Sequence, residues 1–386
     1  MPKAKVLQNC IDLVRAPYRG LPERYAGRRA VGYLCSYAPL ELLHAAGLTP
    51  VRVVQSSAPV TRADAHLPSF CCALARATTE RMLSGELGFL HGVLFAHSCD
   101  TMQCLADVWP MANGQLRVHT FSAPTVLDTA ASRAYCIEEL RRLARAIESD
   151  YGVSISTSAL QRSIQLYNAQ RRLLAELYSE PQQFSAYDRW ALAMAGTLMP
   201  LEEHVAALEA LLGAGSAPAG RAKGPRLYLV GAVLDDPGVL QLIAELDGDV
   251  VGDDLCTGSR YFDTLVDEDS EPYAALAERI LRRAACPCKH SAQAERRSRL
   301  LRALQTHGVQ GVIFVLPKFC EPHAFDYVPL SQAVEELGLG QLLIETDLTV
   351  PREALRTRLQ AFIEMLQQQG GTARRPVGAV ATERAG

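Results

Sequence analysis

The stretch GVIFVLPKFCEPH, residues 311–323, decides the fold, because a run of branched and aromatic side chains ends there in a turn that carries a cysteine. A short apolar run of this kind is typical of a strand buried on both faces. AVGYLCSY at residues 30–37 and GVLFAHSCD at residues 92–100 repeat the arrangement. Strands buried on both faces occur in parallel sheets covered by helices, so the sequence predicts an α/β protein.

Other segments continue this alternation of strands and helices. Further strands are expected at residues 50–54, 116–121, 226–234, 249–251 and 341–344. Helices are expected at residues 41–46, 72–83, 131–212 with interruptions near 151–157 and 181–186, 238–246, 272–283, 294–306, 330–337 and 351–366. The spacing predicts two Rossmann-like domains with parallel sheets, plus helical segments.

The expected division into domains depends on one stretch of small residues. AGSAPAGRAKG, residues 214–224, is nearly free of large apolar side chains and is interpreted as a linker. We therefore expect an N-terminal α/β domain with a helical extension over residues 1–213 and a C-terminal α/β domain over residues 225–368. Residues 369–386 have little to bury and are expected to form a flexible tail.

The composition excludes several classes of protein. The chain has 386 residues, of which 48% are hydrophobic and 21% charged, as in ordinary globular proteins. Its net charge of −3 provides no basic field for nucleic acid or an anionic membrane. No apolar run reaches the roughly 18 residues that a membrane span needs, and the N-terminus lacks the pattern of a secretory signal. We expect a cytoplasmic protein that binds neither nucleic acid nor membranes.

Eleven cysteines are the unusual feature of the composition. In a reducing compartment they serve as metal ligands, catalytic thiols or buried fillers rather than disulfides. Cys35, Cys99, Cys256 and Cys320 each follow a predicted strand. Loops at the carboxyl ends of parallel strands converge on a crevice, so thiols from both domains are expected to meet there. Several thiolates with few histidines favour zinc or an iron–sulfur cluster.

The other cysteines have competing interpretations. An isolated cysteine is more often a small buried filler than a ligand, and this applies to Cys10 and Cys136 on expected helices. Cys71 is adjacent to Cys72, and Cys104 lies where a helix is expected to start, so these too fit a core role. Cys286, Cys288 and His290 offer a zinc alternative, although the chain has no CxxC pair.

Nucleotide chemistry has no support in the sequence. Neither GxGxxG nor GxxxxGK[ST] occurs, so we expect that this chain binds no nucleotide and hydrolyses no ATP itself. His323 and Asp326 follow Cys320 and could transfer protons, but polar residues after a strand are more often turn or cap residues.

Seven motifs, in order along the chain, resemble the 2-hydroxyacyl-CoA dehydratase and benzoyl-CoA reductase superfamily. They are CSYAPLELLHAAGLTPVRV (35–53), LPSFCCALAR (67–76), HSCDTMQCLADVW (97–109), DDLCTGSRYF (253–262), CPCKHSAQAERR (286–297), GVIFVLPKFCEPHAFDY (311–327) and LLIETDLTVPREALRTRLQAFIEML (342–366). The resemblance covers nearly the whole chain except the termini and the expected linker. It implies an oxygen-sensitive iron–sulfur protein that receives single electrons from a separate ATP-hydrolysing iron–sulfur activator.

The resemblance also implies a set of ligands in the crevice between the domains. Cys35, Cys99 and Cys320 match the three cysteines that hold a [4Fe–4S] cluster in the dehydratases. Cys72, Cys256 and Cys286 fall in similar motifs and extend the set to six, as a double-cubane [8Fe–9S] cluster would need. Cys288 departs from the expected pattern after Cys286 and is given a lower rank.

For the activity, the DDLCTGSRYF and CPCKH motifs favour the aromatic-ring reductases and the double-cubane reductases over the dehydratases, and we expect a subunit of an ATP-dependent benzoyl-CoA reductase. A double-cubane reductase of small molecules is the second interpretation, and a 2-hydroxyacyl-CoA dehydratase subunit is the third. An electron-relay or structural subunit beside a catalytic homologue is the alternative from another class. The expected partners are a homologous subunit, in a homodimer or heterodimer, the activator and an acyl-CoA substrate.

Four residues beside the expected ligands are candidates for proton transfer. They are Ser36, His97, Glu321 and His323, with Asp100 as a further neighbour of Cys99. Each is equally suited to donate a hydrogen bond to a sulfur or to cap a helix.

Overall fold

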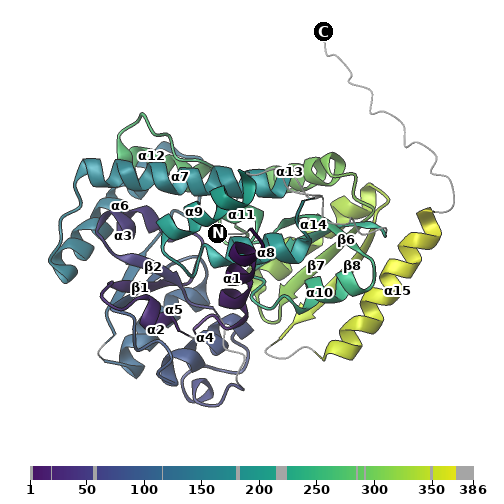
Figure 1. Ribbon diagram of the computed structural model, residues 1–386, viewed down its shortest axis with the longest axis horizontal. Coiled ribbons are helices and arrows are strands. Elements are labelled where there is room, and N and C mark those ends of the chain that lie inside the picture. Colours follow the sequence, from purple (N-terminus) through teal and green to yellow (C-terminus); the bar gives the residue numbers. More distant parts are fainter. Residues whose placement is uncertain are drawn as a thin grey trace, which may run out of the picture.

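The computed structural model describes residues 3–18, 20–54, 59–114, 116–179, 183–213, 224–283, 286–290, 293–347 and 351–370. In these residues the chain forms two parallel four-stranded sheets with helices around them (Figure 1). The prediction of an α/β fold with parallel sheets is therefore confirmed. The expected linker lies outside the described residues except for Gly224, and so does the expected tail except for Gln369 and Gly370, which end the last helix.

The first sheet has the strand order β2-β1-β3-β4, and every neighbouring pair is parallel. Its strands are β1 (Ala30–Tyr33), β2 (Thr49–Arg52), β3 (Gly92–Ala96) and β4 (Val118–Phe121). All residues of β1 and β3 are buried, as their uninterrupted apolar sequences predict.

The second sheet repeats this order as β6-β5-β7-β8, again with parallel pairs only. Its strands are β5 (Arg226–Gly231), β6 (Asp249–Asp254), β7 (Gly311–Pro317) and β8 (Gly340–Thr346). β6 extends three residues beyond the expected end at Val251, because Asp253 and Asp254 pair with Leu229 and Val230 of β5.

The first half of the chain supplies most of the helices. They are α1 (Lys3–Arg15), α2 (Leu21–Arg24), α3 (Leu40–Ala45), the short 3₁₀ helix η1 (Ala63–Ala65), α4 (Ala73–Leu83), α5 (Asp100–Ala112), α6 (Ala130–Tyr151), α7 (Thr157–Ser179), α8 (Ala186–Ala195) and α9 (Leu201–Leu212). The segment expected to be helical over 131–212 has one break more than predicted, just before Pro200, which occupies the N-cap position of α9.

The second half contributes α10 (Gly238–Glu245), α11 (Ser259–Phe262), α12 (Pro272–Arg282), α13 (Gln293–Thr306), α14 (Glu321–Glu336) and α15 (Arg352–Gly370). α14 begins directly after Cys320, whereas the sequence predicts a helix only from Leu330. Pro322 is tolerated in the first turn, where its missing N–H has no helical acceptor. Pro329 lies inside the helix. Packing onto the sheet maintains the helix at this point, because the rings of Tyr327 and Phe314 meet edge to face with their centres 4.9 Å apart.

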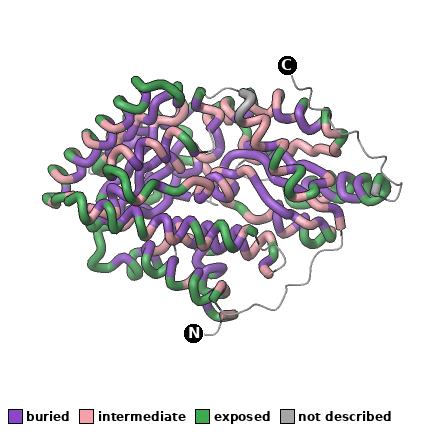
Figure 2. The backbone as a smooth tube through the Cα atoms, turned by 90° about the horizontal axis from the view of Figure 1, so that it is seen from above, coloured by how far each residue is buried: buried purple, intermediate pink, exposed green. Residues whose placement is uncertain are grey.

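Helices from each half pack against the other half. α8 contacts β6, and α12 lies along α6, far from the strands that precede it in sequence (Figure 1). One continuous apolar core accordingly contains Leu13 of α1, Val51 of β2, Trp190 of α8, Leu229 of β5 and Leu359 of α15. Figure 2 shows buried backbone through the centre of the molecule, with exposed segments around its edge. No helix among the described residues is both long and apolar enough to cross a membrane.

Candidate functional site

The loops that follow the strands place four cysteines at the carboxyl edges of the two sheets, and two of them, Cys99 and Cys320, lie at equivalent points. Cys35 follows β1 and Cys99 follows β3, at the point where the strand order of the first sheet reverses. In the second sheet Cys256 follows β6 and Cys320 follows β7. Cys99 and Cys320 also occupy the N-cap positions of α5 and α14. Ligand sites of open parallel sheets form at such positions.

These thiols lie close enough to interact electrostatically. Burial raises the pKa of Cys320 to about 12, and the neighbouring thiols of Cys72, Cys99 and Cys256 contribute to the rise. Burial likewise raises the pKa of Cys35 to about 11, with contributions from Cys286 and Cys256. The structure thus brings all six cysteines predicted as ligands into one group, to which both sheets contribute.

Cys288 is a seventh member of this group. A hydrogen bond from Cys288 lowers the pKa of Cys99 to about 7 and that of Cys286 to about 6, and the two bonds together raise the pKa of Cys288. The Cys288 thiol therefore lies between the sulfurs of Cys99 and Cys286. Among the ligands expected from the sequence, Cys288 is ranked low. That ranking does not consider the CPC spacing, which places two thiols on a single turn.

Contacts with the first half of the chain hold this turn in place. The amide of Lys289 donates to the Cys286 carbonyl at 2.8 Å, and the Lys289 ammonium donates to the Ala123 carbonyl at 2.8 Å. His290 forms an isolated bridge with Val126, beyond the end of β4. The position of α12 beside α6 explains why a turn from the second half of the chain reaches this place.

Buried arginines surround the thiols with positive charge. Arg260 of α11 pairs with Asp254 at 3.1 Å, and Arg283 donates to the Ser36 carbonyl and to the Arg260 carbonyl. Arg260 and Arg283 lower the pKa of Cys256 against the larger, opposite effect of burial. Nη1 of Arg260 and Nε of Arg283 are buried without a hydrogen-bond partner. A buried donor left unpaired costs about 1–3 kcal/mol, so two of them beside a thiol group indicate a place for an acceptor.

The donor set, cysteine thiols from both halves of the chain, is of the kind that holds an iron–sulfur cluster or zinc. Two thiolates on one zinc ion lie at most about 4.6 Å apart, because each Zn–S bond is about 2.3 Å long. Within the part of the chain that the structure describes, no three His, Cys, Asp or Glu side chains are arranged around one ion, and His290 of the zinc alternative is exposed. Ligands of a cluster bind separate irons and spread more widely, and sulfide atoms accept hydrogen bonds from donors such as Arg260 and Arg283.

The candidates for proton transfer differ in their surroundings. The Ser36 hydroxyl accepts from Arg283 at 3.2 Å, and Nδ1 of His97 lies 3.0 Å from the Ser122 hydroxyl. Nδ1 of His323 lies 3.4 Å from the Cys320 sulfur, and burial, with Arg260 and Arg296, holds its pKa well below the usual value. Glu321 is exposed in the first turn of α14. His323 is therefore the candidate in direct contact with a thiol of the group.

The remaining cysteines, together with Asp326, have other surroundings. Cys10 on α1 and Cys136 on α6 are buried among apolar side chains, in agreement with a filler role. Cys71 is half-buried and Cys104 is exposed on α5, so the core role expected for Cys104 is wrong. Asp326 accepts from Arg296 at 2.6 Å, which makes it part of an ion pair.

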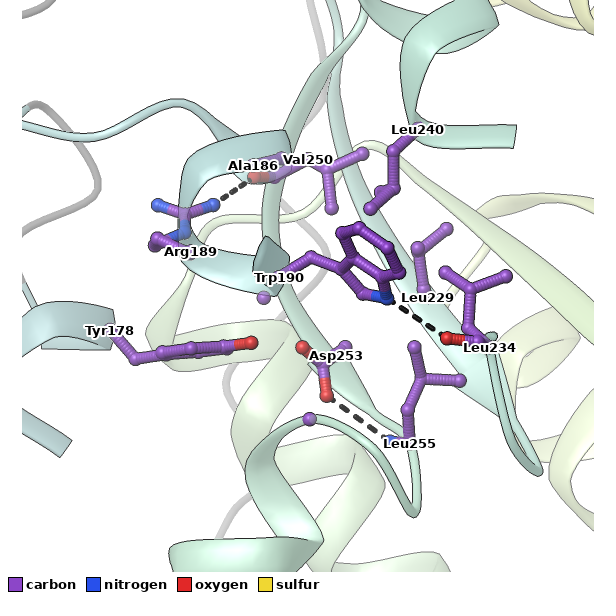
Figure 3. A pocket seen from close by; sticks show the side chains of 12 residues that line it. Tyr178, Ala186, Arg189, Trp190, Leu229, Leu234, Leu240, Val250, Asp253 and Leu255 are labelled. Carbon is purple, nitrogen blue, oxygen red and sulfur yellow. Dashed lines mark hydrogen bonds between the residues drawn. The ribbon is translucent and has the colours of Figure 1, made fainter. Parts of the chain in front are cut away.

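A small cavity lies beside the loop that carries Cys256 (Figure 3). It has a volume of about 20 Å³, and Tyr178, Arg189, Trp190 and Asp253 line it. The Asp253 carboxylate accepts from the amides of Leu255 at 3.1 Å and Ser259 at 2.8 Å, so it spans the loop on both sides of the cysteine. The turn requires glycine at position 258, because a Cβ there would lie 2.1 Å from Oδ1 of Asp253.

Comparison with known proteins identifies the family. Residues 35–366 match the family described as 2-hydroxyglutaryl-CoA dehydratase, D-component. The chain belongs to this family. The match begins at Cys35 and spans all seven motifs that support the sequence resemblance, so that prediction is confirmed.

Several characterised members of the superfamily are similar over most of their length. The beta subunit of lactoyl-CoA dehydratase from Anaerotignum propionicum is 29% identical, over 94% of this chain and 98% of that protein. The beta subunit of (R)-phenyllactyl-CoA dehydratase from Clostridium sporogenes is 27% identical, over 92% and 97%. A benzoyl-CoA reductase subunit from Thauera aromatica is 28% identical, over 87% and 91%. The chain is thus a relative of subunits of two acyl-CoA dehydratases and of a benzoyl-CoA reductase.

Proposed function

We propose that this chain is the iron–sulfur subunit of an enzyme that transforms an acyl-CoA thioester with single electrons of low potential. The observation that carries the proposal is the group of seven thiols between the two sheets, with unpaired donors of Arg260 and Arg283 beside it. The relatives named above act on lactoyl-CoA, phenyllactyl-CoA and benzoyl-CoA, and we extend the acyl-CoA class to this chain.

Cys35, Cys99 and Cys320 would hold a [4Fe–4S] cluster, and Cys72, Cys256 and Cys286 would extend it to a double cubane. When bound, such a cluster supplies a one-electron reductant of very low potential. The chain's own residues keep this site dry and positively charged. Arg260 and Arg283 stabilise thiolate charge and would do the same for the sulfides of a bound cluster, and His323 presents Nδ1 to the Cys320 sulfur as a hydrogen-bond partner.

Among the possible reactions, we favour dehydration of a 2-hydroxyacyl-CoA. The two dehydratase beta subunits named above match over 97–98% of their own length, compared with 91% for the ring-reductase subunit. Reduction of an aromatic acyl-CoA, which the DDLCTGSRYF and CPCKH motifs favour, is the second candidate because the identity to the ring-reductase subunit is nearly the same. The subunit names of the relatives support assembly with a homologous partner, and the proposal includes a separate ATP-hydrolysing activator.

Anaerobic reconstitution with iron and sulfide tests the proposal. We expect about four irons per chain for one cubane or about eight for two, with matching sulfide. The loaded protein, its partner subunit and the activator are then supplied with ATP and either a 2-hydroxyacyl-CoA or benzoyl-CoA. Loss of water from the first substrate indicates the dehydratase, and reduction of the ring indicates the reductase. A protein that takes up zinc but no iron would contradict the proposal.

A further inference from the structure

A buried tyrosine joins two of the segments that carry thiols. Tyr37 lies two residues after Cys35, in the loop that follows β1, and is 2% exposed. Its hydroxyl oxygen accepts a hydrogen bond from the backbone N–H of Cys286 at 3.3 Å. A residue from the first half of the chain therefore holds the turn at residues 286–288, which belongs to the second half.

The backbone of the same residue acts on Cys35. Burial raises the pKa of Cys35 and Cys286 adds to the rise, whereas hydrogen bonds from the Ser98 side chain and from the Tyr37 amide oppose it. The amide of Tyr37 thus faces the Cys35 sulfur while its hydroxyl faces Cys286. One residue is therefore in contact with two thiol-bearing segments that are far apart in sequence.

Two cations hold the ring of this tyrosine. Cζ of Arg283 lies 4.6 Å from the ring centre, and Nζ of Lys289 lies 5.6 Å from it. Both cations are themselves anchored, because Arg283 donates to the Arg260 carbonyl at 2.7 Å and Lys289 donates to the Ala123 carbonyl at 2.8 Å. Attraction between a cation and the face of an aromatic ring fixes the ring, so the hydroxyl has little freedom to turn elsewhere.

The phenolic hydrogen has no acceptor within the described part of the chain. There the Tyr37 hydroxyl accepts from Cys286 but donates to no oxygen, nitrogen or sulfur. Burial raises the pKa of Tyr37, Arg283 opposes the rise, and the thiols of Cys286 and Cys35 add to it, so both sulfurs lie near the hydroxyl. A buried donor without an acceptor is costly, so this position favours an acceptor beside the two thiols.

Sulfur is the acceptor that fits these surroundings. A carboxylate placed here would be buried beside thiolates of the same charge. A thiolate or sulfide of a bound cluster accepts hydrogen bonds, and such bonds stabilise the additional negative charge of the reduced state. A phenol carries its hydrogen at neutral pH and can donate it.

We propose that Tyr37 is a positioning residue for the thiol group: its hydroxyl oxygen holds the Cys286 amide, and its phenolic hydrogen is donated to a sulfur of the bound cluster. The donation to a cluster rests on the proposed function, whereas the contact with Cys286 does not. In this arrangement Tyr37 ties Cys35 to Cys286 and raises the reduction potential of the cluster.

Alkylation of the full-length chain, freed of iron with a chelator, tests the positioning. Tyr37→Phe retains the ring and its contacts with the two cations and removes only the hydroxyl. The Cys286 thiol is buried, so iodoacetamide reaches it when the turn opens, and opening is easier without the hydrogen bond. Mass spectrometry should show Cys286 alkylated about three- to tenfold faster in the variant. Cys136, in the apolar core, should react at an unchanged rate.

Tyr25→Phe is the matched control. The Tyr25 hydroxyl is also buried and donates to the Leu198 carbonyl at 2.8 Å, in the core that contains α1 and α8. This variant likewise loses one buried hydrogen bond, but not one that holds the turn. It should leave the alkylation rate of Cys286 as in the unmodified chain.

A redox titration of the reconstituted protein, followed by electron paramagnetic resonance, tests the donation. Tyr37→Phe should change the one-electron equilibrium about tenfold towards the oxidised state, which lowers the potential by about 59 mV. Site-specific incorporation of 3-fluorotyrosine at position 37 retains the shape but makes the phenol a stronger donor, so it should raise the potential instead. A residue with a merely structural role would not give opposite shifts. Tyr25→Phe should leave the potential unchanged.

Three results would overturn the inference: unchanged alkylation of Cys286 in Tyr37→Phe, an equal increase in Tyr25→Phe, or one and the same potential with phenylalanine and with 3-fluorotyrosine at position 37. A chain that takes up no iron loses the proposed function and with it the donation, whereas alkylation still decides the contact with Cys286. A chain that takes up iron but shows no effect of Tyr37→Phe retains the cluster and loses the role of Tyr37.

Discussion

The two sheets have the same strand order but carry different chemistry on the loops after their strands. In the first sheet both loops at the reversal of strand order carry cysteines, Cys35 after β1 and Cys99 after β3. In the second sheet the loop after β7 carries Cys320, whereas the loop after β5 carries Asp235 and lines a cavity. Equal topology therefore sets where the loops converge, and the loop residues decide whether thiols gather there or a cavity forms.

Replacing a first-sheet cysteine gives the largest expected effect. Cys99→Ser should lose most of the iron after anaerobic reconstitution, because Cys99 lies within the thiol group and is in contact with Cys288. Iron per chain measures the effect. Cys136→Ser, in the apolar core, is the control and should bind as much iron as the unmodified chain. Equal iron in both variants would remove Cys99 from the ligand set.

A second-sheet cysteine tests whether the six thiols hold one cubane or two. If Cys72, Cys256 and Cys286 hold a second cubane, Cys256→Ser should lose roughly half of the iron and sulfide and retain the rest. Complete loss would indicate that the iron is held as a single cluster that needs Cys256. Unchanged iron would place Cys256 outside the ligands.

A buried histidine on helix α9 provides a test of stability that leaves the cysteine-bearing loops unchanged. Burial lowers the pKa of His204 on α9 to about 4, although its contact with the Leu192 carbonyl opposes the shift. Below about pH 6.5 His204 binds a proton in the unfolded chain but not in the folded chain. The free energy of unfolding should therefore decrease as the pH falls from about 6.5 to 4, by about 3 kcal/mol in all. Chemical denaturation across this range measures it. His204→Gln should flatten the profile, whereas exposed His66→Gln should leave it steep.

The smallest expected effect concerns Cys288. Cys288→Ala should retain the iron of the unmodified chain, because the thiol is in hydrogen-bond contact with Cys99 and Cys286 and is not counted among the six ligands. Its removal should lower the reduction potential of the cluster, since hydrogen bonds to the sulfurs favour the reduced state. A redox titration followed by electron paramagnetic resonance measures the change, and Cys288→Ser should restore part of it. Iron loss in the alanine variant would show Cys288 to be a ligand.

The sequence predicts the strands well because their apolar runs are local signals. β3 has the predicted bounds, and β7 differs by one residue. The start of α14 is wrong because Pro329 suggests a boundary, whereas the contact between Phe314 and Tyr327 maintains the helix through it. Packing between distant residues overrides a local preference in this case.

The site is predictable to the extent that it depends on motifs. Six cysteines follow from the family motifs, and the structure brings them together. Arg52 and Asp235 are 183 positions apart and meet at 3.0 Å because β2 and the loop after β5 face each other across the crevice. No spacing along the chain indicates that contact. Cys288 is intermediate: its CPC turn is visible in the sequence, but its position between Cys99 and Cys286 depends on how α12 packs beside α6.

The core that runs from α1 and α8 into the second sheet has a consequence for electron transfer. Because Leu13, Trp190 and Leu229 belong to one close-packed interior, the two sheets cannot separate without exposing it to water. The spacing between their facing edges is thus set by interior packing and not by the loops. A metal centre held across those edges would keep nearly constant ligand geometry in both oxidation states, which lowers the reorganisation needed for each electron.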